Sequence, residues 1–423
     1  MIEIPFEQYQ LANGLRVILS PEPRTPVVAV NLWYKVGSRN ERPGRTGFAH
    51  LFEHMMFQGS SHVPDTAHFA YIEKAGGTLN GSTWLDRTNY YETLPAHYLE
   101  LALWLESDRM AYLLPAMTQE KLDNQRDVVK NERRWRVDNQ PYGDWDERLQ
   151  MMMYPPEHPY HHSVIGSMED LDAASLQDVE SFFRTYYAPN NAVLTICGDY
   201  DRAHVKALVE QYFAEIPAGP AIPPIPGALE VAPVLGEEKR VVVEQDISLP
   251  RTFLAFRVPP YGDERFYAAD VAATILGTGK ASLLHRTLVL KNQTAQDVAA
   301  YAFPIVVGAA ILVVLATAAE TAETERVEGD LLSALDALRT VSDDDVTRAV
   351  NLIAAKHLTE LQRVDQRADA FSMMTTLFDD PARVNTEIDR YRAVDTADVR
   401  AFANEFLGAD NRGVLTYIPQ SAS

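Results

Sequence analysis

The chain has 423 residues, of which 46% are hydrophobic and 23% charged, and this is the composition of an ordinary globular protein. A chain of this length exceeds the size at which one hydrophobic core keeps growing, so two or more domains are expected. The formal net charge of −21 at pH 7 argues against a nucleic-acid partner, because the phosphates would be repelled. The single cysteine, Cys197, excludes an internal disulfide and a cysteine-based zinc site.

The N-terminal segment shows no basic region followed by an apolar core, so no signal peptide is visible. This favours a cytoplasmic protein, and a periplasmic location stays open if an export signal has been removed. Further along, Asn13-Gly14 predicts a two-residue turn between strands at residues 6–11 and 15–19. Another strand is expected at residues 25–36, before a loop rich in arginine and glycine.

The run that follows this loop contains two histidines and a glutamate in the order His50-Leu-Phe-Glu53-His54. On a helix these three side chains fall within one narrow arc of the surface. Two imidazoles one turn apart can share a metal ion, and a carboxylate beside them can hold or deprotonate a metal-bound water. The pattern therefore predicts a catalytic zinc site. The alternative is a solvated helix face, which the apolar flanks disfavour: Phe48, Leu51, Phe52, Met55, Met56 and Phe57.

A catalytic zinc needs a third protein ligand and an open position for water. The helix predicted at residues 118–138 offers Glu132, which stands among compensating basic residues. The other elements expected in this half are a helix at 67–75, paired strands within 76–94, helices at 96–114, 175–187 and 203–213, and a strand at 192–198.

Residues 216–227 include five prolines and cannot form regular structure, so this stretch is predicted to be a linker. The expected organisation is an N-terminal zinc-binding catalytic domain (1–215), a Pro-rich linker (216–235) and a homologous C-terminal domain without metal ligands (236–423).

The second half repeats the order strand, break, loop and helix, with residues 252–260 matching 30–38 at an offset of 222 residues. At this offset the three motif positions fall on Ala272, Ile275 and Leu276. A duplicated domain is thus expected to keep the packing and to lack the metal-binding groups.

The most apolar run, residues 305–319, is too short to span a bilayer and is rich in β-branched side chains. It predicts a buried strand, and no membrane partner is expected. Helices at 320–338 and 343–363 and a final helix and strand within 396–417 complete the predicted elements.

The order His-x-x-Glu-His is the reverse of His-Glu-x-x-His, and the sequence resembles the pitrilysin-type (inverzincin) zinc metallopeptidases. It is most similar to the short, half-length branch that includes the mitochondrial processing peptidases, and looks like the zinc-bearing subunit of a heterodimeric bacterial member. The matching segments extend over nearly the whole chain: Gly37-Ser38-Arg-Asn-Glu41, Gly76-Gly77 to Asn80, Asp86-Arg-Thr-Asn-Tyr-Tyr91, His158-Pro-Tyr-His-His to Ile165-Gly166, and Gly277-Thr-Gly-Lys-Ala-Ser282. The resemblance implies an α+β fold of two related domains, each an antiparallel-rich sheet packed by helices (the processing-peptidase, LuxS-like metallohydrolase fold).

The resemblance also implies roles for the motif residues. In the family the third ligand is a glutamate about 76 to 78 residues beyond the second histidine, and here 132 − 54 = 78. His50, His54 and Glu132 would accordingly bind one Zn²⁺ per chain. Glu53 would be the general base that acts on the zinc-bound water.

Two further residues match the part of the family pattern that holds the substrate. Asn80 corresponds to the edge-strand asparagine that binds the substrate backbone, and Gly81 follows it where the family usually has alanine. An extended peptide would bind there by strand addition, with modest sequence preference.

The chain departs from the family pattern at two places. Gln125 stands where the family often has an additional glutamate, seven residues before the third ligand, and an uncharged amide supports metal binding less. Active members also use an arginine and a tyrosine, seven positions apart, to steady the substrate carbonyl. The matching positions here are Val289 and Gln296, with Tyr301 nearby but out of register; a misalignment of this segment is the alternative.

These departures imply that a related partner subunit supplies the arginine and tyrosine, so a heterodimer is favoured, while a homodimer stays open. The expected function is that of a zinc endopeptidase subunit acting on unfolded peptides. The alternative is a non-catalytic structural or assembly subunit of the core-protein type. The complete set of predicted zinc ligands and general base argues against this alternative, because a structural subunit needs no general base beside a zinc ion with an open coordination position. A specific processing peptidase and a general peptide scavenger are not distinguished.

Overall fold

The computed structural model describes residues 3–420 and divides by its contacts into two compact units. Unit 1 consists of the described residues up to Arg133 together with His162–Pro226 and Leu358–Thr386. Unit 2 consists of Arg134–His161, Gly227–His357 and the described residues from Glu387 onward. With 48% helix and 19% strand, the predicted α+β class is confirmed. The predicted domains, 1–215 and 236–423, divide the chain into two halves that are proposed to be related. The two units instead divide the chain by which residues pack together.

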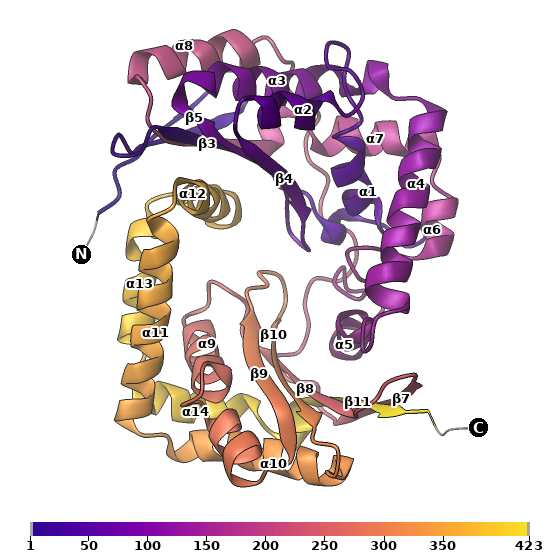
Figure 1. The fold of residues 1–423 in the computed structure, drawn as a ribbon, viewed down its shortest axis with the longest axis vertical. Helices are drawn as coiled ribbons and strands as arrows, with labels where there is room; N and C mark the ends of the chain where they lie inside the picture. Colours follow the sequence, from indigo (N-terminus) through magenta and orange to yellow (C-terminus); the bar gives the residue numbers. More distant parts are fainter. Residues whose placement is uncertain (1–2, 421–423) are drawn as a thin grey trace. The chain divides into compact units, whose positions relative to one another are not determined.

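Unit 1 is built on a six-stranded sheet with the order β1-β2-β6-β3-β5-β4 (Figure 1). The strands are β1 (Glu7–Gln10), β2 (Arg16–Pro21), β3 (Val27–Tyr34), β4 (Thr78–Thr83), β5 (Thr88–Pro95) and β6 (Ala192–Gly198). Within the described part of the chain, β2 and β6 form the one parallel pair of this sheet. The predicted hairpin is present, since β1 and β2 are antiparallel on either side of Gly14, whose φ is +94°. Its loop has three residues and not the predicted two, because Leu11 N–H donates to the Leu15 carbonyl at 2.9 Å. Strand β4, which follows the His-x-x-Glu-His motif along the chain, lies at an edge.

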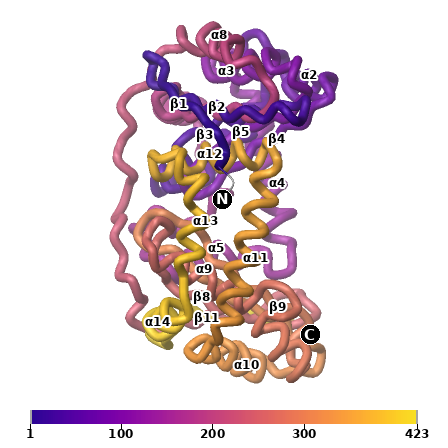
Figure 2. Tube along the Cα trace, turned by 90° about the vertical axis from the view of Figure 1, so that its left-hand side faces the viewer, coloured from indigo at the N-terminus to yellow at the C-terminus, as the bar shows by residue number. Residues whose placement is uncertain are grey.

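Helices cover both faces of this sheet. They are α1 (Phe48–Met55), α2 (Ala67–Lys74), α3 (Leu99–Ala116), α4 (Gln119–Arg133), α6 (Met168–Asp172), α7 (Leu176–Tyr186), α8 (Arg202–Phe213) and α12 (Val364–Phe378). Figures 1 and 2 show α12 against β3, on the side of the sheet opposite α3. Apolar side chains from the sheet and from α1, α3, α7 and α8 form the core of unit 1.

Helix α12 comes from the C-terminal part of the chain and is tied to the sheet by one carboxylate. Asp369 Oδ1 accepts hydrogen bonds from Trp33 Nε1 (2.9 Å) and Asn31 Nδ2 (3.2 Å) of β3, and from Asn89 Nδ2 (3.2 Å) of β5. These three bonds, together with a hydrogen bond of 2.8 Å from Ser372 Oγ to Thr195 Oγ1 of β6, hold the helix against the sheet. No element was predicted from the sequence at the position of α12.

Unit 2 contains a five-stranded sheet with the order β7-β11-β8-β10-β9. The strands are β7 (Lys239–Gln245), β8 (Arg251–Val258), β9 (Ala295–Phe303), β10 (Ala310–Ala318) and β11 (Arg412–Pro419). The strand predicted within the apolar run 305–319 is β10, every residue of which is buried. Within residues 3–420, no helix combines the length and the apolar character that crossing a lipid bilayer requires.

The helices that lie wholly in unit 2 are α5 (Trp145–Met153), α9 (Glu264–Gly277), α10 (Thr324–Ala337) and α14 (Thr396–Phe406), whereas α11 (Asp343–Leu361) and α13 (Arg383–Ala393) have residues in both units. Short π-helical turns occupy Arg134–Asp138 and His285–Lys291. Helix α5 comes from the N-terminal half, and its Trp145 stacks on Phe253 of β8 with ring centroids 5.3 Å apart. Each sheet is therefore covered in part by a helix from the other half of the sequence.

One strand pairing is similar in the two halves, and the offset of 222 residues between the halves stays a prediction. Tyr34 of β3 pairs with Ala192 of β6, and Phe256 of β8 pairs with Arg412 of β11, so Phe256 occupies the place of Tyr34. The three positions matched to the motif lie in α9 and are fully buried apolar residues: Ala272, Ile275 and Leu276.

A pair of asparagines repeats the same hydrogen bonds in the two units. Asn191 Nδ2 donates to the carbonyls of Tyr186 (2.8 Å) and Lys35 (3.4 Å). Asn411 Nδ2 donates to the corresponding carbonyls of Phe406 and Arg257, each at 2.8 Å. Each asparagine thus joins the end of the helix that precedes it, α7 or α14, to the end of a strand, β3 or β8.

Replacing Asn411 by alanine is expected to lower the free energy of unfolding by about 1–3 kcal/mol, because two buried carbonyls lose their donor. Urea denaturation monitored by circular dichroism measures this change. Asn351→Ala, at an exposed position of α11, is the control and should cause no destabilisation, since alanine favours a helix. Equal midpoints for Asn411→Ala and the unmodified chain would contradict the structural role.

Candidate metal centre

Helix α1 begins at a point defined by a buried carboxylate. Gly47, its N-cap residue, has a left-handed backbone conformation with φ +85°. Glu41 accepts the N–H groups of Gly47 (2.9 Å) and Ala49 (2.7 Å), one on each carboxylate oxygen. These contacts satisfy N–H groups that a helix start leaves without partners and place an acceptor at the positive end of the helix dipole. The first turn of α1, which includes His50, is therefore well anchored.

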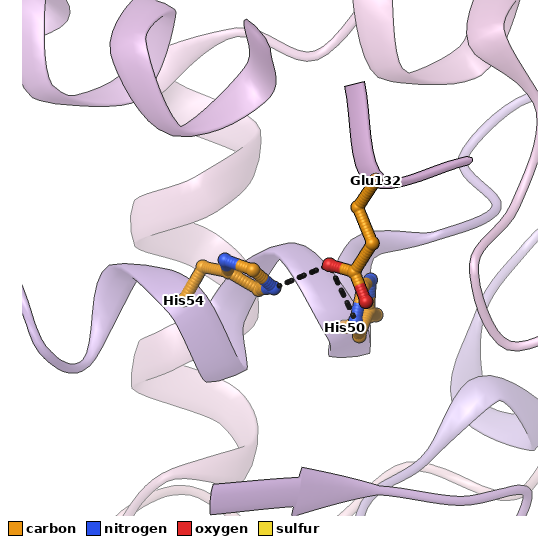
Figure 3. A group of neighbouring side chains, drawn as sticks. All are labelled: His50, His54 and Glu132. Carbon is orange, nitrogen blue, oxygen red and sulfur yellow. Dashed lines mark ion pairs between the residues drawn. The ribbon is translucent and has the colours of Figure 1, made fainter. Parts of the chain in front are cut away.

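The apolar side of α1 is buried in the core of unit 1, and its polar side meets α4. His54 Nε2 lies 3.2 Å and His50 Nε2 3.8 Å from the same oxygen, Glu132 Oε2 (Figure 3). One ligand atom from each residue can be chosen so that all three lie within 4.8 Å of one another. The structure thus brings together the three residues that the sequence analysis predicted as ligands, although 78 positions separate His54 from Glu132.

The donor set of two imidazole nitrogens and one carboxylate oxygen fits a zinc ion. Catalytic zinc sites use three such protein ligands and leave a fourth position open. All three side chains are only 13–22% exposed, so the group is neither fully buried nor solvated on all sides.

Glu53 lies on α1 next to His54 and faces strand β4. Burial raises the pKa of its carboxyl group above the usual range, while a hydrogen bond with Thr83 and the charge of His54 act in the opposite direction. A Cβ atom at Gly81 of β4 would lie 3.1 Å from Glu53 Cγ. Gly81 therefore lets the edge strand approach the carboxylate more closely than a larger residue would.

The other residues singled out in the sequence lie as follows. Asn80 is exposed on the edge strand β4 beside Tyr91 of β5, and its Oδ1 accepts the N–H of Gly81 at 2.9 Å. Gln125 is buried in α4, two turns before Glu132. Val289 and Gln296 belong to unit 2, where Val289 lies in the π-helical turn and Gln296 is exposed on β9.

A second group of possible ligands, His68, Glu92 and Glu106, is fully buried in unit 1. Its charges are already balanced, because Arg109 pairs with Glu106 through Nε at 3.0 Å and through a second, shorter contact. Burial raises the pKa of Glu92 well above its usual range and lowers the pKa of His68 to about 3. A protonated carboxyl and a neutral imidazole beside an ion pair need no metal for charge balance.

Sequence reasoning missed the residues that hold α1 in place. Glu41 and Gly166 both stand in segments that carried the family resemblance, but neither received a role. Hydrophobic periodicity gives no indication that a loop glutamate caps a helix that begins seven positions later. Their contacts are visible only in three dimensions.

Comparisons with known proteins identify a peptidase family that matches most of the chain. Residues 16–155 match the family described as "Insulinase (Peptidase family M16)", and residues 173–353 match the family described as "Peptidase M16 inactive domain". Together the two matches include all the residues of the candidate centre and most of the second half.

Two curated relatives illustrate the range of similarity. A protein of Helicobacter pylori named "Zinc protease PqqE" is 33% identical over 293 residues, which cover 69% of this chain and 65% of that protein. The "Probable mitochondrial-processing peptidase subunit beta" of Arabidopsis thaliana is 24% identical over 412 residues, which cover 94% of this chain and 75% of that protein. The match to the first relative thus spans less than two thirds of that relative's length.

A solved structure of a protease from Helicobacter pylori superposes with a TM-score of 0.93 at 26% sequence identity. The superposition covers 99% of this chain and 100% of that one. The two chains therefore share the fold over their whole described length.

Proposed function

Because the chain belongs to peptidase family M16, we propose that it is a zinc-dependent endopeptidase subunit that hydrolyses unfolded peptides. The predicted resemblance to the pitrilysin-type metallopeptidases is confirmed by both family matches. The observation that supports activity most directly is the arrangement of His50, His54 and Glu132 around one point, with Glu53 on the same helix. A subunit with a purely structural role has no need of this set.

In the proposed mechanism His50, His54 and Glu132 hold one zinc ion. When bound, zinc supplies a Lewis acid that lowers the pKa of a coordinated water and polarises the substrate carbonyl. The partly buried position of the three side chains limits competing water and strengthens their electrostatic interactions. Gln125 stands seven residues before Glu132 on α4. Its uncharged amide would support the metal ligands less strongly than a carboxylate at the same position.

Glu53 is the proposed general base. It takes a proton from the attacking water and afterwards gives that proton to the amine of the departing peptide. The rise in the pKa of Glu53 on burial suits this exchange, because a more basic carboxylate accepts the proton more readily. A Cβ added at Gly81 would lie 3.1 Å from Glu53 Cγ, and this close approach supports a base beside the strand that we expect to bind substrate.

Strand β4 is the proposed binding site for the peptide backbone. It is an edge strand, so its outward N–H and C=O groups take no part in the sheet and can pair with an extended peptide. Asn80 is exposed on this strand and can donate to the peptide through its amide. Recognition through backbone groups favours unfolded substrates with little sequence preference.

A related partner subunit is proposed to supply the arginine and tyrosine that family members use on the substrate carbonyl. Val289 and Gln296 hold the corresponding positions here, and neither offers a cationic or phenolic donor. A heterodimer is favoured, because a homodimer would lack the same donors twice.

Adding the related subunit is expected to raise kcat/KM for peptide hydrolysis by about 100- to 1000-fold, the usual effect of one well-placed oxyanion donor. The assay compares the zinc-loaded chain alone, the partner alone and their mixture on one fluorogenic peptide. Chelation of zinc should abolish the activity of the mixture, and restored zinc should recover it. Full activity of the chain alone would contradict the need for a partner but not the peptidase function.

A further inference from the structure

A single glycine touches both helices that carry the proposed zinc ligands. Gly166 has φ +71°, and a Cβ at this position would lie 2.3 Å from the nitrogen and 2.4 Å from the Cα of Gly47. Gly47 is the N-cap residue of α1 and stands three positions before His50. At Gly47 itself, a Cβ would lie 2.6 Å from the carbonyl oxygen of Ile165. The two backbones are thus packed so closely that neither residue can carry a side chain without movement.

The other side of Gly166 faces α4. Its carbonyl oxygen accepts a hydrogen bond of 2.7 Å from Arg133 Nη1, and Arg133 directly follows Glu132. Two more bonds tie α4 to the adjoining helix α6, which lies beside it in Figure 1. Lys130 Nζ reaches Asp172 at 2.7 Å, and Arg126 Nε donates to the Leu171 carbonyl at 2.8 Å.

Helix α6 is also joined to the residues before α1. Asp170 Oδ2 accepts the N–H (2.9 Å) and the hydroxyl (2.6 Å) of Thr46. The hydroxyl oxygen of Thr46 accepts the N–H of Ser167 at 3.1 Å. Residues 166–172 therefore contact the start of α1 on one side and the length of α4 on the other.

We propose that Gly166 is a positioning residue for the metal centre, which sets the spacing between His50 and His54 on α1 and Glu132 on α4. This inference rests on the proposed zinc binding. Zinc–ligand distances tolerate only about 0.2 Å of error, so a small shift of one helix weakens the site. Because 78 positions separate His54 from Glu132, the chain between them does not fix this spacing, and packing must do so.

The test compares Gly166→Ala with Gly44→Ala. Gly44 lies in the loop before α1 and has a similar φ of +79°, but a Cβ there would have nothing within 4 Å. Both variants carry the same kind of backbone strain, and only Gly166→Ala displaces α1. Gly166→Ala is expected to raise the Kd for zinc by about 10- to 100-fold, the range typical of groups that support metal ligands. Gly44→Ala should change it less than about threefold.

Zinc affinity is measured by competition with a chromogenic chelator, and thermal unfolding of the metal-free chain serves as the control for folding. Equal zinc affinities in the two glycine variants would overturn the proposal. If Gly166→Ala does not fold, the Arg133→Ala variant tests the proposal instead. A Kd for zinc that rises about tenfold in Arg133→Ala and is largely restored in Arg133→Lys supports the proposal. An unchanged Kd in Arg133→Ala overturns it.

The unmodified chain separates this inference from the proposed function. If that chain binds no zinc, the proposed function and the inference are both wrong. If it binds zinc and the variants behave alike, only the positioning role of Gly166 is wrong.

Discussion

Replacing Glu53 by glutamine is expected to lower kcat for peptide hydrolysis by about 100- to 10,000-fold while leaving zinc bound, because glutamine keeps the shape of the side chain and cannot accept the proton. Glu53 is not one of the three residues whose ligand atoms converge, so its loss removes no ligand. The measurements are kcat on a fluorogenic peptide, in the presence of the partner subunit, and zinc content by atomic absorption.

Glu73→Gln on α2 is a suitable control, because Glu73 is exposed on a neighbouring helix. It should leave both kcat and zinc content unchanged. Hydrolysis by Glu53→Gln at the rate of the unmodified chain would remove Glu53 from the role of base. A loss of zinc in the same variant would mean that Glu53 contributes to metal binding.

Replacing His54 by alanine is expected to raise the Kd for zinc by more than about 100-fold, beyond the effect of residues that only support the ligands. His54 Nε2 is the nitrogen nearer to Glu132, at 3.2 Å, so its removal leaves two ligands on separate helices. Activity should fall to the level seen after chelation.

Thermal unfolding provides an independent measurement of the same change. A ligand that binds only the folded state stabilises it by about 2.7 kcal/mol when its free concentration is a hundred times the Kd. Zinc should therefore raise the Tm of the unmodified chain and of His97→Ala, in which an exposed histidine is lost. The same zinc concentration should leave the Tm of His54→Ala unchanged. Full zinc occupancy in His54→Ala would exclude this histidine as a ligand.

Local patterns were sufficient to predict much of each unit. The turn at Asn13-Gly14, the motif helix and the buried strand β10 can each be predicted from a few neighbouring residues. His50, Glu53 and His54 share one helix, so their proximity follows from helix geometry. The helix predicted at residues 118–138 offered Glu132 as a candidate, and the family spacing supported this choice, because no local pattern indicates which of many acidic residues approaches a helix 78 positions earlier.

Contacts between distant segments could not be predicted in this way. Asp369 meets Trp33 and Asn31 across more than 330 positions, and α12 itself was not predicted. The use of Gly166 as a contact for both α1 and α4 depends on how two loops pack, which a glycine in the sequence does not disclose. Both contacts join segments that are far apart in the sequence, and no repeating pattern of residues links those segments.

The origin of α12 has a consequence for biosynthesis. All six strands of the first sheet exist once the ribosome has passed Gly198, but the helix that covers one face ends only at Phe378. At about 5–20 residues per second, the intervening 180 or so residues take roughly 10–40 s to translate. During that time Trp33 and Asn31 lack the carboxylate of Asp369. Unit 1 therefore completes its packing after most of unit 2 has been made, and a nascent chain that stops before Val364 cannot complete it at all.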